Sequence, residues 1–248
     1  MPLLEAKSVT KAFGALLAVN RTDLKVEAGR VHAIIGPNGA GKTTLFNLLA
    51  GVFPPTFGQV IFENRDISPL KLHQRARIGI GRSYQVTSIF PELTVHENVR
   101  LAVQAKSRYG FSLFRPAAGL TEIRDKTEAV LDEMGLSGFG AQTANTIPYG
   151  IQRSLDVAIA LATEPKILLL DEPTSGMSPD DTIKMIALIK RISRRYTIVV
   201  IEHHMNVVMS ISDVITVLSQ GQVIAEGPPE EIKGNNEVKR AYFGGGKI

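Results

Sequence analysis

Short runs of consecutive apolar residues recur along the chain and predict buried β-strands. They occupy residues 31–35, 167–170 and 197–201. Four apolar residues without a polar one, as at 167–170, are typical of a strand covered on both faces, the usual environment in a parallel sheet. After the first run, apolar residues follow helical spacing at Leu45, Phe46, Leu48 and Leu49. This alternation of strands and helices predicts an α/β fold.

Helical patterns dominate the middle of the chain. Residues 94–97, Thr-Val-His-Glu, have the form of a capping box before an apolar stretch, and a second pattern ends at Gly135. We therefore expect a helical insertion at residues 85–161 in a core formed by residues 1–84 and 162–248. Two more helices are expected, one at residues 152–162 and one with Ser178 as N-cap and Pro179 as first residue. The apolar face predicted for the last helix consists of Ile183, Ile186, Ala187 and Ile189.

A complete phosphate-binding loop lies between the strand at 31–35 and the helix after it. It matches the pattern G-x-x-x-x-G-K-[ST], and the context of strand, loop and helix is the one that this motif requires. Its glycines allow backbone N–H groups to converge on phosphates, Lys42 neutralises the outer phosphates, and Thr43 offers a hydroxyl to Mg²⁺. The chain is therefore expected to bind a nucleoside triphosphate through Gly36, Pro37, Asn38, Gly39, Ala40, Gly41, Lys42, Thr43 and Thr44.

Two adjacent carboxylates, Asp171 and Glu172, end the apolar run at 167–170. Open α/β sheets bind ligands at the carboxyl ends of their strands, so both side chains are expected at the nucleotide. Successive side chains of a strand alternate in direction, so that one can address a metal ion and the other a water molecule. We assign Asp171 to the metal and Glu172 to general-base catalysis. A positioned base contributes about 10²- to 10⁴-fold in rate.

Bulk composition narrows the class without naming a function. With 248 residues, 44% hydrophobic and 21% charged, the chain has the profile of an ordinary globular protein. It has no cysteine, so disulfides and thiolate metal sites are excluded. The net charge of +4 is spread along the sequence, and nucleic acid binding is not expected. Neither a signal peptide nor a membrane span is predicted, which favours the cytosol unless a partner tethers the chain.

Further motifs make the chain resemble the ATP-binding cassette (ABC) family of transporter subunits over essentially its whole length. The resemblance implies ATP and Mg²⁺ as ligands. It identifies Gln85, in the sequence RSYQ, as the Q-loop glutamine that reaches the metal and the attacking water. His203, in IEHH, corresponds to the switch histidine that contacts the terminal phosphate, and Phe13 to the aromatic residue that stacks on adenine. The implied catalytic residues are Glu172, His203, Gln85 and Lys42, and the implied metal-binding residues are Thr43, Gln85 and Asp171.

The same resemblance implies a RecA-like P-loop NTPase core, an inserted α-helical subdomain and an N-terminal antiparallel β region. It also implies partners: a second cassette, of the same or a related chain, arranged head-to-tail around two ATP, and two membrane permease subunits that meet the helical lobe. An external solute-binding protein would act indirectly. Such a subunit is peripheral and lies on the cytoplasmic face of the inner membrane.

The signature segment departs from the family pattern. The usual Leu-Ser-Gly-Gly-Gln is replaced by Ile-Pro-Tyr-Gly-Ile at residues 147–151. Pro148 has neither a hydroxyl nor an N–H group, which removes a hydrogen bond to the partner's terminal phosphate worth about 1.5 to 3 kcal/mol if charge-assisted. The Gly150 backbone and the positive end of the following helix remain. We expect a weakened clamp, either in a homodimer that tolerates it or in a pair with a cassette whose signature is intact.

Within the family, residues 90–99, 201–212 and 237–244 resemble the cassettes of branched-chain amino acid importers, whose relatives also carry amides and small organic acids. The cassette of lipopolysaccharide export shares much of this pattern. A third alternative is a cassette ATPase of DNA repair or translation. That class fuses two cassettes or inserts a long coiled coil, and this chain has one copy of each motif and no sustained heptads.

Overall fold

The computed structural model describes residues 1–83, 89–107 and 117–243. The chain divides into two compact units: residues 1–75 with 193–248 form unit 1, and residues 76–192 form unit 2. The helix α2 (Leu72–Ile78) crosses the division. The units follow internal packing, whereas the boundaries expected at 85–161 follow helical patterns in the sequence, so the assignment of residues 85–161 to a helical subdomain stays a prediction.

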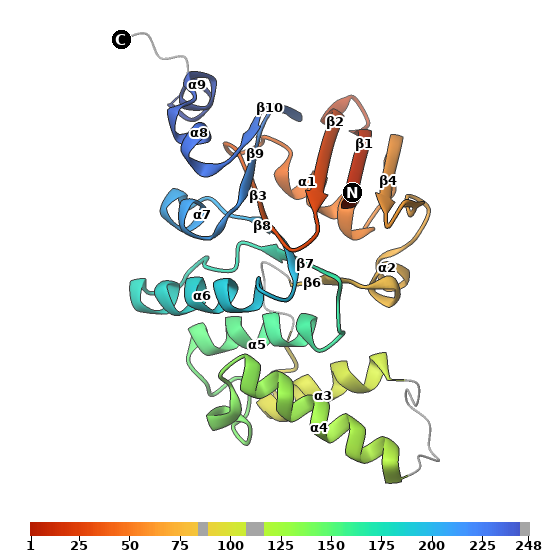
Figure 1. Cartoon of the computed structure of the whole chain (residues 1–248), viewed down its shortest axis with the longest axis vertical. Helices are drawn as coiled ribbons and strands as arrows, with labels where there is room; N and C mark the ends of the chain where they lie inside the picture. The colour runs from red at the N-terminus through yellow and green to blue at the C-terminus, as the bar shows by residue number, and fades with distance from the viewer. Residues whose placement is uncertain (84–88, 108–116, 244–248) are drawn as a thin grey trace. The chain divides into compact units, whose positions relative to one another are not determined.

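Unit 1 combines an antiparallel and a mainly parallel set of strands (Figure 1). In the first set, β1 pairs antiparallel with β2 and β4, and β5 pairs with β4. In the second, β3 is parallel to β8 and β9, and β10 is antiparallel to β9. The strands are β1 (Pro2–Phe13), β2 (Leu16–Glu27), β3 (Val31–Ile35), β4 (Phe57–Phe62), β5 (Arg65–Asp66), β8 (Thr197–Ile201), β9 (Val214–Ser219) and β10 (Gln222–Gly227).

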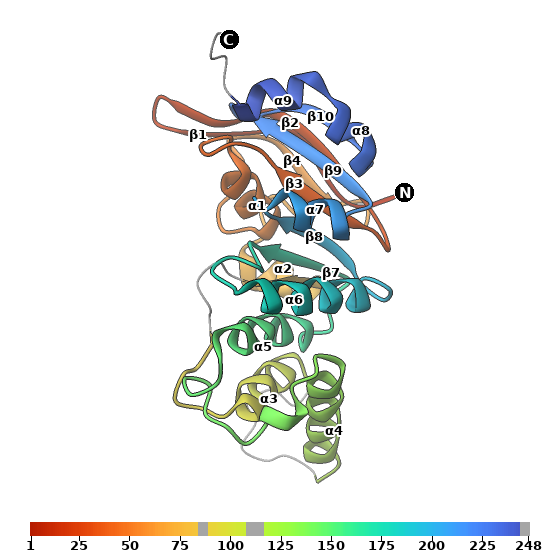
Figure 2. The same cartoon turned by 90° about the vertical axis from the view of Figure 1, so that its left-hand side faces the viewer.

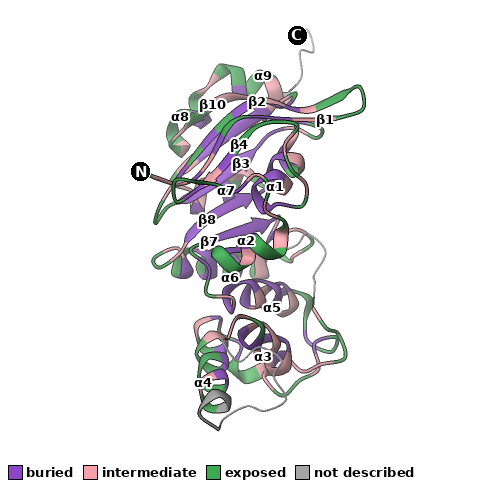
Figure 3. Ribbon diagram, turned by 90° about the vertical axis from the view of Figure 1, so that its right-hand side faces the viewer, coloured by how far each residue is buried: buried purple, intermediate pink, exposed green. Residues whose placement is uncertain are grey.

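Every residue of β3 and of β8 is buried, as the purple ribbons of Figure 3 show. This agrees with the uninterrupted apolar runs at these positions, because central parallel strands are covered on both faces. Four helices accompany the strands: α1 (Lys42–Ala50), α7 (Met205–Ile211), α8 (Pro229–Gly234) and α9 (Asn236–Phe243). Helices α8 and α9 lie beside β10 (Figure 2).

Unit 2 contains a parallel strand pair and a set of packed helices. The pair is β6 (Ile80–Arg82) and β7 (Ile167–Asp171), in which Arg82 lies opposite Leu169. Helix α3 packs against α4 and α5, and α5 packs against α6 and β7. The helices are α3 (Val95–Lys106), α4 (Ala117–Glu133), the 3₁₀ turn η1 (Ser137–Phe139), α5 (Tyr149–Leu161) and α6 (Pro179–Ile192).

Two predicted helix signals of unit 2, the capping box at Thr94 and the stop at Gly135, are confirmed. Thr94 accepts a hydrogen bond from the Glu97 N–H, and the Glu97 carboxylate accepts one from the Thr94 N–H, which completes the capping box. At the end of α4, Gly135 has a φ of 69°. The N–H groups of Gly135 and Leu136 bond to the carbonyls of Asp132 and Leu131, at 3.0 and 2.7 Å. This is the Schellman arrangement that glycine favours.

Two helix predictions were wrong. Helix α5 begins at Tyr149 instead of residue 152, because Pro148 in the N-cap position has the extended backbone that precedes a helix. In α6 the buried face consists of Met185, Leu188, Ile189 and Ile192, whereas Ile183 is 65% exposed. The predicted apolar face was therefore displaced around the helix and shares only Ile189 with the observed one.

Candidate nucleotide-binding site

The phosphate loop joins the buried strand β3 to helix α1 in unit 1, as predicted. Two of its glycines are required by space as well as by backbone angle. A Cβ atom at Gly36 would lie 2.2 Å from the Leu218 carbonyl oxygen, and one at Gly41 would lie 2.4 Å from the Ala18 carbonyl oxygen. Both residues also have positive φ, 153° and 97°. The loop conformation therefore depends on glycine at these positions.

Lys42 lies folded across this loop and is buried. Its Nζ donates to the carbonyl oxygens of Gly36 at 2.7 Å and Pro37 at 3.0 Å. The hydroxyl-bearing Thr43 is exposed, as are Asn38 and Gly39. Because the N-cap residue Gly41 has no side chain, the N-terminus of α1 is not capped from within, and its partial positive charge lies at the loop. This combination of ammonium, hydroxyl and helix N-terminus suits an anionic phosphate chain.

His203 follows β8, the strand next to β3. Ile34 of β3 pairs with Ile201 of β8, so Gly36 and His203 each come two residues after a paired position. The phosphate loop and His203 therefore leave the sheet at the same edge, as expected for parallel strands. His203 is exposed and stands beside His204, with ring centroids 4.1 Å apart.

Phe13 lies at the end of β1 and is 47% exposed. Its ring meets that of Phe53 edge-on, with centroids 5.5 Å apart. The Lys11 ammonium lies 5.3 Å from the Phe13 centroid and 4.7 Å from that of Phe53. Phe13 is thus held by a second aromatic ring while nearly half of it stays exposed, which suits stacking on a base.

Asp171 is the last residue of β7 and is 5% exposed. Its carboxylate lies 3.4 Å from the guanidinium of Arg82, the last residue of the neighbouring strand β6. Burial raises the pKa of the Asp171 carboxyl, while the positive charges of Arg82 and Arg153 oppose this rise. The backbone N–H of Asp171 also meets the Ser83 hydroxyl at 3.4 Å. Asp171 is therefore held in place before any cation binds.

Glu172 has a backbone φ of 46°, in the left-handed region that residues with a Cβ rarely adopt. Its carbonyl oxygen accepts a bond from the Ser175 N–H at 3.1 Å and another from the Arg153 guanidinium. This sharp turn lies directly after β7. Backbone outliers cluster at active sites, so this conformation is compatible with the role predicted for Glu172.

The signature segment forms the start of α5 in unit 2. Pro148 occupies the N-cap position and makes no side-chain capping bond. Gly150 is buried against α6, since a Cβ at this position would lie 2.7 Å from the Asp181 side chain. Tyr149 is 44% exposed, and its hydroxyl donates to the Ser175 carbonyl at 3.1 Å.

The predicted residues thus fall into two groups. Unit 1 holds Phe13, the phosphate loop and His203, and unit 2 holds Asp171, Glu172 and Gly150. Gln85 lies outside the described residues. Of the residues predicted to bind Mg²⁺, Thr43 lies in unit 1 and Asp171 in unit 2, and each carries an oxygen ligand of the kind that this ion prefers. Glu202, His203 and His204 also bring ligand atoms within 4.8 Å of one another.

Sequence reasoning missed three residues at these sites. Arg82 pairs with Asp171, Arg153 binds the Glu172 carbonyl, and Tyr242 of α9 hydrogen-bonds to the backbone of Gly36. Burial raises the pKa of the Tyr242 hydroxyl, and the bond to Gly36 opposes that rise. No sequence motif assigned a role to any of these three side chains. They are identified only by their contacts. The partner lies between 19 residues away along the chain (172 minus 153) and 206 residues away (242 minus 36).

None of the helices in the described ranges combines the length and the apolar character that crossing a membrane requires.

Comparison with known proteins gives matches over the whole chain. Residues 19–175 match the ABC transporter family, and residues 222–248 match the family described as branched-chain amino acid ATP-binding cassette transporter. The chain is 42% identical to the high-affinity branched-chain amino acid transport ATP-binding protein BraF of Pseudomonas aeruginosa, over 98% of each chain. It is 40% identical to LivG, of the same description, from Salmonella typhimurium, again over 98% of each.

A more distant relative is LptB, the ATP-binding protein of the lipopolysaccharide export system of Escherichia coli, with 32% identity over 98% of each chain. Among solved structures, a nucleotide-free ATP-binding cassette from an ABC transporter superposes with a TM-score of 0.85 at 29% identity, covering 98% of this chain and all of that one. These matches confirm the predicted fold, a P-loop NTPase core with a helical subdomain and an N-terminal antiparallel sheet. The chain belongs to the ABC transporter family as an ATP-binding, ATP-hydrolysing subunit of the branched-chain amino acid transport group.

Proposed function

We propose that this chain drives the import of branched-chain or other hydrophobic amino acids, or of related small solutes such as amides and organic acids. The observation that carries the proposal is the match to BraF and LivG over 98% of this chain and of each relative. The buried strand β3, the phosphate loop and the uncapped start of α1 supply the ATP-binding element that such a subunit needs. The cargo itself is expected to contact the permeases and not this chain.

At the phosphates, Lys42 neutralises charge and the loop backbone donates hydrogen bonds. Phe13 stacks on adenine, and His203 contacts the terminal phosphate. Thr43, Asp171 and Gln85 would hold Mg²⁺, which neutralises charge on the phosphates when bound. Glu172 accepts a proton from the attacking water as general base. These roles are proposed from the motifs together with the oxygen donors, burial and backbone geometry described above.

In the complex, we propose that two cassettes face each other head-to-tail around two ATP and join two permease subunits. An external binding protein supplies solute. The chain would then be peripheral, on the cytoplasmic face of the cell membrane. Closure upon ATP moves the permeases, and hydrolysis resets them. The Gly150 backbone, at the start of α5, is the part of the signature segment left to meet the partner's ATP.

The test is recovery of the complex with tagged Glu172→Gln, purified from native membranes in the presence of ATP. Removing the base should leave ATP bound and the cassettes closed, with hydrolysis reduced at least about 100-fold. Two permeases and a second cassette should co-purify, and the same amide substitution at exposed Glu230 should leave turnover unchanged.

Recovery with lipid-export components instead would favour the role of LptB, to which the chain is 32% identical. Recovery from the soluble fraction, without any membrane protein, would favour a cassette that does not serve transport. Undiminished hydrolysis by Glu172→Gln would remove Glu172 from the catalytic role while leaving the transport assignment standing.

A further inference from the structure

Two side chains from the first turns of α5 form hydrogen bonds with the segment that follows β7. Arg153, which is 3% exposed, donates from its guanidinium to the carbonyl oxygen of Glu172. One turn earlier, the Tyr149 hydroxyl donates to the Ser175 carbonyl at 3.1 Å. Two side chains of one helix thus bind two carbonyls of a single four-residue turn. All four residues belong to unit 2.

The turn that they bind has an uncommon backbone. Glu172 adopts a φ of 46°, and Gly176 closes the segment with a φ of 74°. Within the turn, the Ser175 N–H bonds to the Glu172 carbonyl at 3.1 Å. A residue with a Cβ keeps a left-handed conformation only where its surroundings impose it. The guanidinium is a second donor to the same carbonyl, and it comes from outside the turn.

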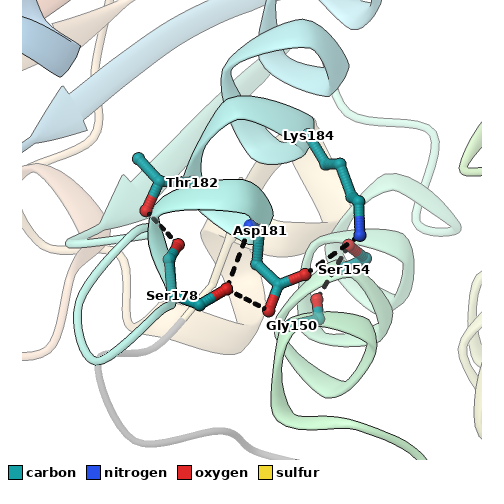
Figure 4. A network of polar contacts seen from close by, with 6 residues as sticks. All are labelled: Gly150, Ser154, Ser178, Asp181, Thr182 and Lys184. Carbon is teal, nitrogen blue, oxygen red and sulfur yellow. Dashed lines mark hydrogen bonds and ion pairs between the residues drawn. The ribbon is translucent and has the colours of Figure 1, made fainter.

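Helix α5 is itself anchored at this end, as Figure 4 shows. Gly150 lies against Asp181, and its carbonyl accepts from the Ser154 hydroxyl at 3.1 Å. The Asp181 carboxylate accepts from the Ser178 hydroxyl at 2.8 Å and lies 3.3 Å from the Lys184 ammonium. The start of α5 therefore packs against the start of α6, the helix that follows this turn along the chain. The Arg153 guanidinium is therefore a buried donor on an anchored helix turn, and the Tyr149 hydroxyl is a partly exposed donor on the same turn.

We propose that Arg153 and Tyr149 are positioning residues for hydrolysis, which hold the Glu172 backbone so that its carboxylate points at the attacking water. The inference rests on the proposed role of Glu172 as general base. Neither residue needs to touch ATP. Their effect passes through the Glu172 carbonyl and the turn at residues 172–175.

The placement also connects two functional segments within one chain. Tyr149 and Gly150 belong to the signature segment, and Glu172 belongs to the catalytic strand end. A shift of the first turn of α5, when the signature segment meets a partner's nucleotide, would move the Arg153 and Tyr149 donors together. The Glu172 carboxylate therefore points at the attacking water only while the first turn of α5 keeps its position.

The experiment is a double-mutant cycle in the assembled, membrane-embedded transporter, with single-turnover ATP hydrolysis as the readout. Arg153→Met keeps the length of the side chain and removes its donors. It should lower the hydrolysis rate about tenfold or more while ATP affinity changes less than about threefold, because only the base is displaced. Arg153→Lys should restore part of the rate, and Tyr149→Phe should cost about threefold. Arg124→Met, at an exposed arginine of α4, is the matched control.

The decisive comparison uses the Glu172→Gln background. If Arg153 acts through Glu172, adding Arg153→Met there should change the residual rate less than about twofold. Equal losses in both backgrounds would overturn the proposal and assign Arg153 to general stability. If Arg153→Met does not fold, Tyr149→Phe carries the same comparison, because that hydroxyl lies at the surface. Normal turnover by Glu172→Gln alone would instead overturn the base role, and that outcome is distinct from a silent Arg153→Met.

Discussion

His32 lies in the middle of β3, the strand that leads into the phosphate loop, and is 2% exposed. Its Nε2 is 2.7 Å from the Thr216 hydroxyl oxygen, and that hydroxyl lies 2.5 Å from a Glu226 carboxylate oxygen. The hydroxyl donates to the carboxylate, so the ring donates to the hydroxyl from Nε2–H. Burial lowers the pKa of His32 from 6.5 to about 4, which keeps the ring neutral at physiological pH.

The lowered pKa of His32 predicts a loss of stability in acid. A histidine whose folded pKa lies below its unfolded one stabilises the fold above pH 6.5, and the contribution is lost as the pH falls toward 4. At pH 5 the loss is about 2 kcal/mol. The free energy of unfolding of His32→Gln should therefore fall less than that of the wild type between pH 7.5 and pH 5, as measured by urea titration.

The control for this titration is His73→Gln, at an exposed histidine of α2, which should keep the acid loss of the wild type. The Glu226 carboxylate lies 4.0 Å from the His32 ring and acts in the opposite direction, because it favours the protonated form. Parallel curves for wild type and His32→Gln would show that the attraction of Glu226 for the protonated ring offsets the effect of burial.

At the scale of elements, a buried arginine closes the end of helix α1. Arg75 is fully buried, and its guanidinium donates to the carbonyls of Leu48 and Leu49 at 2.6 and 2.8 Å and to that of Ile67 at 2.8 Å. Carbonyls in the last turn of a helix have no partner within the helix. Gly51, with a φ of 80°, leaves the space that the guanidinium occupies, since a Cβ there would lie 2.6 Å from Arg75 Nε.

Removing the Arg75 guanidinium should destabilise unit 1 strongly. Arg75→Met leaves several buried carbonyls without a donor, at a cost of about 3 kcal/mol or more in the free energy of unfolding. Urea unfolding monitored by circular dichroism measures the change. Arg77→Met, at an exposed residue of the same helix, should cost less than about 0.5 kcal/mol. A loss for Arg75→Met as small as that of the control would show that water replaces the guanidinium.

Features set by neighbouring residues could be predicted from the sequence, whereas features set by contacts with distant residues could not. The strands β3, β7 and β8, the capping box at Thr94 and the end of α4 at Gly135 are set by neighbouring residues, and all were predicted correctly. The buried face of α6 and the start of α5 depend on what packs against them, and both were misplaced. Arg75, Arg153 and Tyr242 gain their roles from partners far along the chain, so no local pattern marks them. The roles of Asp171, Glu172 and His203 rest on motifs alone and stay predictions.

At the scale of the whole assembly, the signature departure has a testable consequence. Pro148 is the N-cap residue of α5 and makes no side-chain capping bond. A serine there supplies a hydroxyl that can cap α5, worth about 1 kcal/mol, or donate to a phosphate of the ATP held by a partner cassette. Capping of α5 acts already in the isolated chain, whereas the phosphate contact forms only when two cassettes close around ATP.

We therefore expect Pro148→Ser to raise ATPase turnover severalfold in the assembled transporter. Pro148→Ala is the matched control, because it removes the ring without adding a hydroxyl and should leave turnover near the wild-type value. Thermal unfolding of the isolated chain separates the capping effect from the phosphate contact. A serine variant that is more stable but turns over no faster would show that the hydroxyl only caps α5. The Gly150 backbone and the start of α5 would then suffice to engage the partner's nucleotide, and the proline would not weaken the clamp.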